Sequence, residues 1–211
     1  TPACAKCMSR SLMRWKRLFV EPSDLNSRLR RIGFRLSGPG ENHLDPKSES
    51  DIEETLFEAI GLIGKDIRLA GWVLAWIDVH GDRVIIEKLA KMAKREGWNR
   101  KKPHPWLTLV SSHAVEAGYG RWRTLLQPLR PHAHLFPKAI SQSAIQLKGA
   151  VPYLEKAGVL VPNRSLRIQP ENVLDKISLA KRHRQYRNRY LFGPCWRADI
   201  ITAIESGEVR A

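Results

Sequence analysis

A long run of apolar residues at helical spacing constrains the fold more than any other feature of this chain. Ile52, Leu56 and Ile60 recur every four positions, which places them on one face of a helix over 50–63. A second apolar pattern of the same period covers 66–80. Two amphipathic helices in direct succession predict a mainly helical fold, because each must bury its apolar face against another element.

Two details of these segments carry a structural and a functional interpretation. Ser50, three residues before Glu53, fits a capping box at the start of the first helix. Trp72 and Trp76 are four residues apart and share one face of the second helix. Base stacking is one interpretation of the tryptophans; core packing is the other, and the flanking apolar residues favour it.

The rest of the chain also reads as mostly helical. The apolar patterning predicts further helices over 87–96, 106–117, 141–157, 181–190 and 196–204. Ser141 or Ser143 is the expected N-cap of the third of these helices, and Gly97 and Gly158 are expected to end two of them. The last helix, which begins at Trp196, is expected to pack back onto the core. The hydrophobic content is 43%, near the globular average, so we expect a sizeable buried core.

A β-hairpin is predicted after Gly158. The short apolar runs 159–161 and 166–168 flank the polar turn 162–165, which is typical of two antiparallel strands joined by a turn. Pro152 is expected to kink or divide the helix that precedes them. The phrase from Tyr153 to Leu160 resembles the end of the recognition helix and the first wing strand of bacterial winged-helix regulators.

The resemblance covers about residues 138–169 and implies a helical bundle with a winged helix-turn-helix module and one short β-hairpin. It implies that Ser141, Gln142, Ser143, Gln146 and Lys148 approach the major groove of DNA, where Gln pairs with adenine and Lys with guanine. Arg164 and Arg167 would approach phosphate or the minor groove. The implied role is a transcriptional regulator of bacterial type, an antitoxin, or a mobile-element or defence accessory. A helix–hairpin unit without a ligand remains the structural alternative.

The net charge of the chain points to a polyanionic partner. It has 36 Lys and Arg against 21 Asp and Glu, which gives +15 and a pI of about 10.2. A compact domain with this excess repels itself, and binding a polyanion relieves the repulsion. Nucleic acid, double-stranded DNA in the first place, is the expected partner, with an anionic membrane surface second. No segment reaches the roughly 20 apolar residues of a membrane span, so we expect no membrane insertion.

Cations outside the resemblance gather in three short segments. The residues expected to contact nucleic acid there are Lys101, Lys102, Arg121, Arg123, Lys181, Arg182, Arg184, Arg187 and Arg189. Trp122, Tyr186 and Tyr190 are interleaved with these cations and offer stacking surfaces for single-stranded RNA, which is the main alternative function. Anchoring of the next short helix is the structural alternative for Trp122.

Composition shifts divide the chain into three expected parts. Residues 1–48 form a basic N-terminal arm and linker, and 49–130 form a helical domain with a candidate first helix-turn-helix. Residues 131–211 form the winged-helix module with a basic C-terminal helix. The acidic helix over 50–63 is the expected contact for a homodimer or a protein partner, and a non-enzymatic scaffold subunit is a further alternative.

The sequence offers no catalytic constellation. Cys4 and Cys7 have zinc-knuckle spacing, but no second pair follows, and Cys195 could join them only through long-range folding. We therefore expect no metal, no cofactor and no enzyme, with a nuclease kept as an alternative. Three cysteines are too few for a disulfide scaffold, and an odd number fits a reducing compartment, so the expected location is the cytoplasm.

Overall fold

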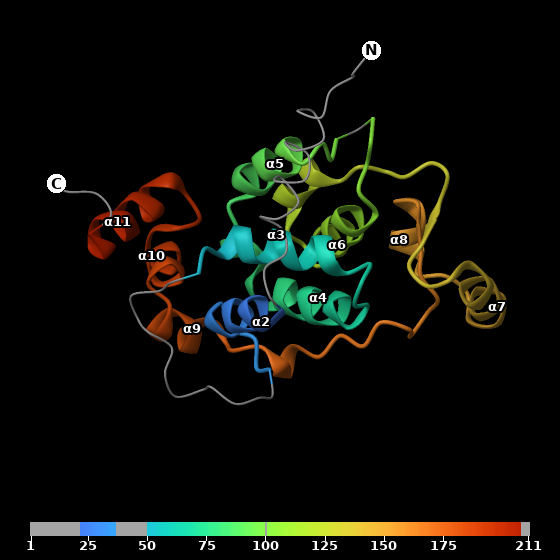
Figure 1. Cartoon of the computed structure of the whole chain (residues 1–211), viewed down its shortest axis with the longest axis horizontal. Helices are drawn as coiled ribbons and strands as arrows, with labels where there is room; N and C mark the ends of the chain where they lie inside the picture. The colour runs from blue at the N-terminus through green and yellow to red at the C-terminus, as the bar shows by residue number, and fades with distance from the viewer. Residues whose placement is uncertain (1–21, 37–49, 100, 208–211) are drawn as a thin grey trace, which may run out of the picture.

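The computed structural model describes residues 22–36, 50–99 and 101–207, and these residues are mainly helical, as the sequence predicts (Figure 1). The α-helices are α2 (Pro22–Arg31), α3 (Ile52–Leu62), α4 (Arg68–His80), α5 (Ile86–Arg95), α6 (Pro105–Glu116), α7 (Lys138–Lys148), α8 (Pro152–Lys156), α9 (Lys176–Arg182), α10 (Arg184–Phe192) and α11 (Trp196–Ser206). Short 3-10 turns η1 (Gly81–Arg83), η2 (Gly120–Leu125) and η3 (Pro170–Asn172) and strands β1 (Ala133–His134) and β2 (Val159–Leu160) complete the described chain. None of the described helices is long and apolar enough to cross a membrane.

Helices α3, α4 and α6 lie together at the centre of the molecule and form the core (Figure 1). Ile52, Leu56 and Val110 are fully buried, which confirms the apolar faces predicted for these helices. The cap of α3 differs from the prediction. Asp51 is the N-cap and accepts a hydrogen bond of 2.9 Å from the Glu54 amide, whereas the expected capping partner Glu53 turns into the interior.

The acidic residues of α3 do not form the expected partner surface. Glu53 is fully buried, and Glu58 pairs with Arg28 of α2. Glu54 is the one acidic side chain of this helix that is exposed. The expectation that this helix mediates dimerisation is therefore wrong, because its carboxylates neutralise cations of the same chain.

The two tryptophans of α4 have different environments. Trp76 is fully buried, its Nε1 donates a 2.7 Å hydrogen bond to the Ile32 carbonyl, and its ring stacks with Phe34 at 6.5 Å between centroids. Core packing is thus the correct interpretation for Trp76. Trp72 is only partly buried and lines a surface groove.

The predicted hairpin is wrong, because β2 pairs in parallel with β1. Residues 166–168 form no strand. The turn 162–165 is instead tied back to the end of α7, where the Asn163 amide donates to the Gly149 carbonyl and its side-chain nitrogen to the Lys148 carbonyl, both at 3.0 Å. These bonds direct the following residues away from β2.

After this turn the chain crosses over α4 at Gly71. A Cβ atom on Gly71 would lie 2.4 Å from the carbonyl oxygen of Arg167, so only glycine allows the close approach. We call residues 162–169 the strap. It runs along one side of the molecule from α7 towards α2 (Figure 1), where residues 33–35 bond to residues 172–174.

One hydrophobic core includes residues on both sides of the boundary expected near residue 130. Leu129, Leu135 and Val159 are buried in the same cluster as the apolar residues of α3, α4 and α6. The division into three parts stays a prediction, and residues 1–21 and 37–49, which make up most of its first part, lie outside the described residues.

Gly158 tests how tightly β2 is fitted to its neighbours. Its φ is +86°, and an added Cβ would lie 2.2 Å from the Leu129 carbonyl oxygen. Gly97 also has a positive φ, +77°, but no atom within 4 Å of an added Cβ. We expect Gly97→Ala to lower the free energy of unfolding by about 1 kcal/mol, the cost of the left-handed backbone.

We expect Gly158→Ala to cost more than about 2 kcal/mol, because the overlap adds to the backbone cost. Urea denaturation of both variants measures the difference. Equal losses would show that the close approach of the Leu129 carbonyl does not exist in solution.

Candidate nucleic-acid interface

Helix α7, which we call the arm, stands at the edge of the molecule, apart from the central helices (Figure 1). Pro152 separates the arm from α8, which confirms that the predicted helix is divided. The arm begins at Lys138 after Pro137, so the prediction that Ser141 or Ser143 is the N-cap is wrong. Ser141 is also wrong as a base-reading residue, because it is fully buried and lies 3.0 Å from Nδ1 of His134 in a hydrogen bond.

The other predicted reading residues of the arm face solvent. Gln142, Ser143, Gln146 and Lys148 are all exposed. The buried stripe expected along this helix is wrong for Leu147, whose side chain is 84% exposed. The chain has no Asp or Glu between Glu116 and Glu155, so the arm carries cationic and neutral hydrogen-bonding side chains without a carboxylate.

The strap extends the basic surface from the base of the arm. Arg164 lies in the turn that is bonded to the end of α7, has a φ of +60° and is exposed. Arg167 lies farther along and is exposed as well. The structure therefore places both predicted wing arginines on one continuous segment, although that segment is not a β-hairpin.

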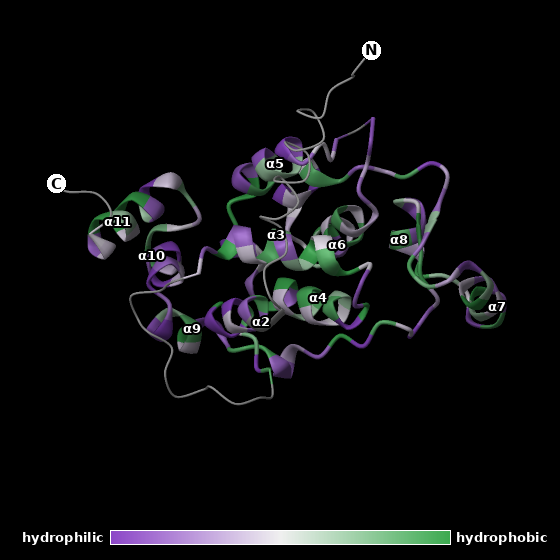
Figure 2. Ribbon diagram, in the orientation of Figure 1, coloured by the Kyte–Doolittle hydropathy of each residue, from purple (hydrophilic) through white to green (hydrophobic). Residues whose placement is uncertain are grey.

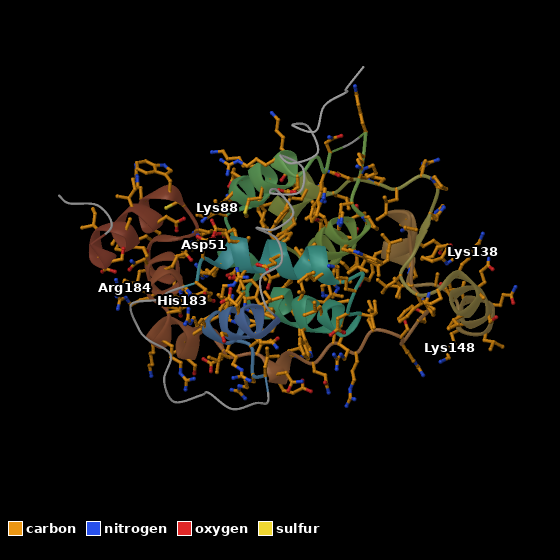
Figure 3. All side chains as sticks on the ribbon, viewed as in Figure 1. Asp51, Lys88, Lys138, Lys148, His183 and Arg184 are labelled. Carbon is orange, nitrogen blue, oxygen red and sulfur yellow. The ribbon has the colours of Figure 1, made fainter. Side chains whose placement is uncertain are left out.

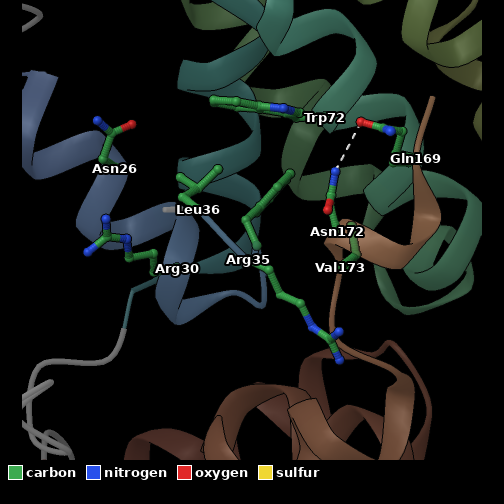
Figure 4. Close-up of a pocket in the computed structure, with 10 residues that line it drawn as sticks. Asn26, Arg30, Arg35, Leu36, Trp72, Gln169, Asn172 and Val173 are labelled. Carbon is green, nitrogen blue, oxygen red and sulfur yellow. Dashed lines mark hydrogen bonds between the residues drawn. The ribbon is translucent and has the colours of Figure 1, made fainter. Parts of the chain in front are cut away.

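A groove beside Trp72 continues from the strap. Two hollows of about 300 Å³ each share Trp72 and Gln169 as walls, and no carboxylate lines either of them. Figure 4 shows one hollow, with Trp72 on one side and the hydrogen-bonded carboxamides of Gln169 and Asn172, 3.1 Å apart, on another. Arg30 and Arg35 line this hollow, and Arg167 lines the other. The Trp72 groove thus joins an aromatic ring to cations and amides, a combination suited to phosphates and bases.

A line of polar side chains fixes the base of the arm. His113 of α6 lies 2.7 Å from the Asp78 carboxylate of α4 and 2.9 Å from the Tyr153 hydroxyl of α8. Burial, together with the charge of Asp78, raises the pKa of Tyr153 to about 12. The phenol therefore stays protonated at neutral pH, and the line ties α8 to the two core helices.

The predicted basic helix over 181–190 is broken at His183, which ends α9 and caps α10. Lys181 and Arg182 are exposed, Arg184 is partly buried, and Arg187 pairs with Glu205 at 3.0 Å. Tyr186 is fully buried and its hydroxyl lies 2.7 Å from Nδ1 of His80. The prediction that Tyr186 stacks with bases is therefore wrong.

The nucleic-acid contact predicted for Arg189 is also wrong. Its guanidinium is fully buried and binds both oxygens of Glu53, at 2.5 and 2.8 Å, and both oxygens of Asp199, at 2.9 and 3.0 Å. Burial acts to lower the pKa of Arg189, but the two carboxylates outweigh it and raise the pKa above its ordinary value. The side chain is a structural cation, and the sequence gave no sign of this because both partners lie outside the arginine run.

Of the residues predicted around Trp122, only Arg123 is exposed without an acidic partner among the described residues. Trp122 is buried, and its Nε1 donates 2.9 Å to the Gly81 carbonyl, so it anchors η2 and cannot stack with a base. Arg121 pairs with Glu87 at 3.1 Å. Tyr190 is 40% exposed and lies under the guanidinium of Arg83.

A second basic surface lies on α5 and the loop that follows it, at the top of Figure 1. Lys91, Lys94, Arg95, Lys101 and Lys102 are exposed there. We call it the α5 surface. Lys101 and Lys102 were predicted from the sequence as contacts, and they stand in a tight turn closed by hydrogen bonds with Asn99.

The structure separates the two signs of charge. Among the described residues, the carboxylates of Asp51, Glu53, Glu58, Asp82, Asp199 and Glu205 each lie within ion-pair distance of a cation of the same chain. The following cations are exposed and have no described carboxylate within that distance: Arg35, Lys91, Lys94, Arg95, Lys101, Lys102, Arg123, Arg130, Lys138, Lys148, Lys156, Arg164, Arg167, Lys181, Arg182 and Arg197. Figure 3 shows their kind as blue side-chain ends around the outline, with Lys138 and Lys148 labelled on the arm.

The candidate zinc ligands cannot be brought together from the described residues. Cys4 and Cys7 lie outside them, and Cys195 is partly buried with its Sγ 3.7 Å from the Phe192 carbonyl oxygen. No group of three or more His, Cys, Asp or Glu side chains with metal-binding geometry occurs among the described residues.

Comparisons of the chain with protein-family models, curated proteins and solved structures found no match. The interface is therefore defined by its geometry alone.

The buried ion pair predicts that Arg189 acts on stability. Arg189→Met leaves the carboxylate of Glu53 buried without its main partner, and we expect the free energy of unfolding to fall by about 3 kcal/mol or more. Arg187→Met is the matched control, because it breaks the exposed pair with Glu205 and should cost at most about 1 kcal/mol.

The double variant Glu53→Leu with Arg189→Met removes both buried charges and should be more stable than Arg189→Met alone. Urea denaturation of the three variants measures these differences. If Arg189→Met were as mild as Arg187→Met, the pair would not be buried in solution.

Proposed function

We propose that this protein binds double-stranded DNA through the arm and the strap, with α7 in the major groove. The observation that carries the proposal is the separation of charge: carboxylates are paired within the chain, while the arm and strap present cations that have no described acidic partner. A nucleic acid supplies the missing anions, and each phosphate contact adds affinity by releasing counterions.

The dimensions of the arm suit a major groove. Eleven residues of α-helix are about 16 Å long, and the groove, about 12 Å wide, admits one helix. Gln142 and Gln146 have the amide pair that hydrogen-bonds to adenine, and Lys148 can donate to guanine. Arg164 and Arg167, on the strap, then lie beside the arm where the phosphate backbone borders the groove.

Duplex DNA is favoured over single-stranded RNA by the fate of the aromatic side chains. Two of the three rings expected to stack with bases, Trp122 and Tyr186, are buried and bonded inside the molecule. Trp72 is the described tryptophan that lines a cationic groove, and we assign that groove to the backbone next to the duplex contact. A regulatory role in transcription would follow only from a preference for particular sequences.

The two basic surfaces give a matched experiment. The triple variant Lys148→Gln, Arg164→Gln and Arg167→Gln removes three cations from the arm and strap. The triple variant Lys91→Gln, Lys94→Gln and Arg95→Gln removes three from the α5 surface, with the same change in net charge. Fluorescence anisotropy with a labelled random-sequence duplex, at several salt concentrations, measures both.

For the arm and strap variant we expect an affinity loss of at least about ten-fold and a salt slope reduced by about 3, one for each lost phosphate contact. The α5 variant should keep the slope of the unaltered protein. The reverse result would place the interface on α5. Displacement of the duplex by single-stranded RNA at equal nucleotide concentration would contradict the preference for duplex DNA.

Gln146→Ala tests whether the arm reads bases. After selection of preferred duplexes from a random pool, the variant should lose about five-fold or more on the selected sequence, with little change on random duplex, because a bidentate base contact discriminates by about 1–3 kcal/mol. Equal losses on both duplexes would mean that the arm contacts only the backbone.

A further inference from the structure

The hairpin of α10 and α11 exposes a large apolar surface. Trp196, Ile200 and Ile204 recur every four residues along α11, and their side chains are 66%, 48% and 45% exposed. Leu191 and Phe192, at the end of α10, are 65% and 56% exposed. Soluble monomers scatter such residues singly, and a contiguous set marks an interaction surface. The sequence prediction that the last helix packs back onto the core is wrong for these residues.

Helix α11 lies at the edge of the molecule and packs mainly against α10 (Figures 1 and 2). The side that faces α10 is already satisfied: Ala198 is buried there, and Thr202 accepts a 3.0 Å hydrogen bond from Asn188. The stripe from Trp196 to Ile204 lies on a different side. A cleft of about 660 Å³ borders it, with Ile200 and Ala203 on the α11 wall.

We propose that this stripe is the contact between two copies of the chain, with the two α11 helices packed antiparallel about a two-fold axis near Ile200. The proposal does not rest on nucleic-acid binding. It rests on the exposed stripe and on the charges around it.

A chain with a net charge of +15 repels a second copy, so two copies can meet only where the local charge is compensated. The α10–α11 hairpin meets this condition. Arg187 pairs with Glu205, and Arg189 pairs with Asp199 and Glu53. The α5 surface and the arm have no such compensation among the described residues.

The charges on α11 also select the antiparallel arrangement. Arg197, whose guanidinium lies 5.5 Å from the Trp196 ring centroid, is near the start of the helix, and Glu205 is near its end. A two-fold axis near Ile200 brings Arg197 of one copy beside Glu205 of the other, and it opposes the two helix dipoles. Ala203 and Gly207 leave room at the end of the stripe for the Trp196 ring of the second copy.

Sedimentation velocity of the full chain tests the proposal, at high salt and with nucleic acid removed so that neither charge repulsion nor bridging by nucleic acid contributes. The unaltered protein should sediment with twice the 24.1 kDa mass of the chain. Ile200→Glu places a carboxylate in the middle of the contact and should raise the dissociation constant of the dimer at least about ten-fold. Leu147→Glu is the matched control, because it adds the same charge to an even more exposed leucine on the arm, and it should stay dimeric.

Trp196→Ala is a second variant that removes apolar area without adding charge, and it should weaken the dimer as well. Circular dichroism of each variant shows whether its helices are intact. A monomeric unaltered protein, a dimer unaffected by both stripe variants, or a dimer broken by Leu147→Glu would each overturn the proposal. Failure of DNA binding would leave the dimer result unaffected, so the two proposals fail separately.

Discussion

The buried ion pair between Arg189 and Glu53 holds the C-terminal helices to the helical body. The guanidinium also binds Asp199, so one side chain joins α3, α10 and α11. It fixes the register of α10, because on the same helix Gln185 donates a 3.0 Å hydrogen bond to Asp51, the cap of α3. Neither partner of the central pair is exposed, and removing one charge would leave the other without compensation in a medium of low dielectric.

The same use of carboxylates determines the surface. Every carboxylate that neutralises a cation inside the chain, as Glu53 does, is lost to the exterior, and the excess of Lys and Arg is therefore concentrated on exposed segments. The arm and strap have this character most clearly, because no acidic residue occurs between Glu116 and Glu155. The α10–α11 hairpin has the opposite character, with paired charges around an apolar stripe. One chain thus presents a surface for a polyanion and another for a neutral, apolar contact.

Local patterns predicted the helices of the body but not the contacts that give each side chain its role. The apolar period predicts α3 and α4 because a buried stripe is a property of neighbouring residues. It does not tell Trp72 from Trp76, which share a face and differ only in what residues far along the chain place over them. Arg189 looks unpaired in its own segment because Glu53 lies 136 positions away. The resemblance correctly placed Gln146 on an exposed helix, whereas the path of the strap depends on a crossing over α4 that no local pattern shows.

Hydrogen–deuterium exchange with and without a random-sequence DNA duplex tests the central claim most directly, because it reports which backbone segments the nucleic acid covers. The account predicts slower exchange in peptides that span 138–150 and 162–169, with little change over the core helices α3 and α6, whose amides are already protected. Unchanged exchange in both of those segments, with slowing confined to α5 and the loop that follows it, would contradict the account.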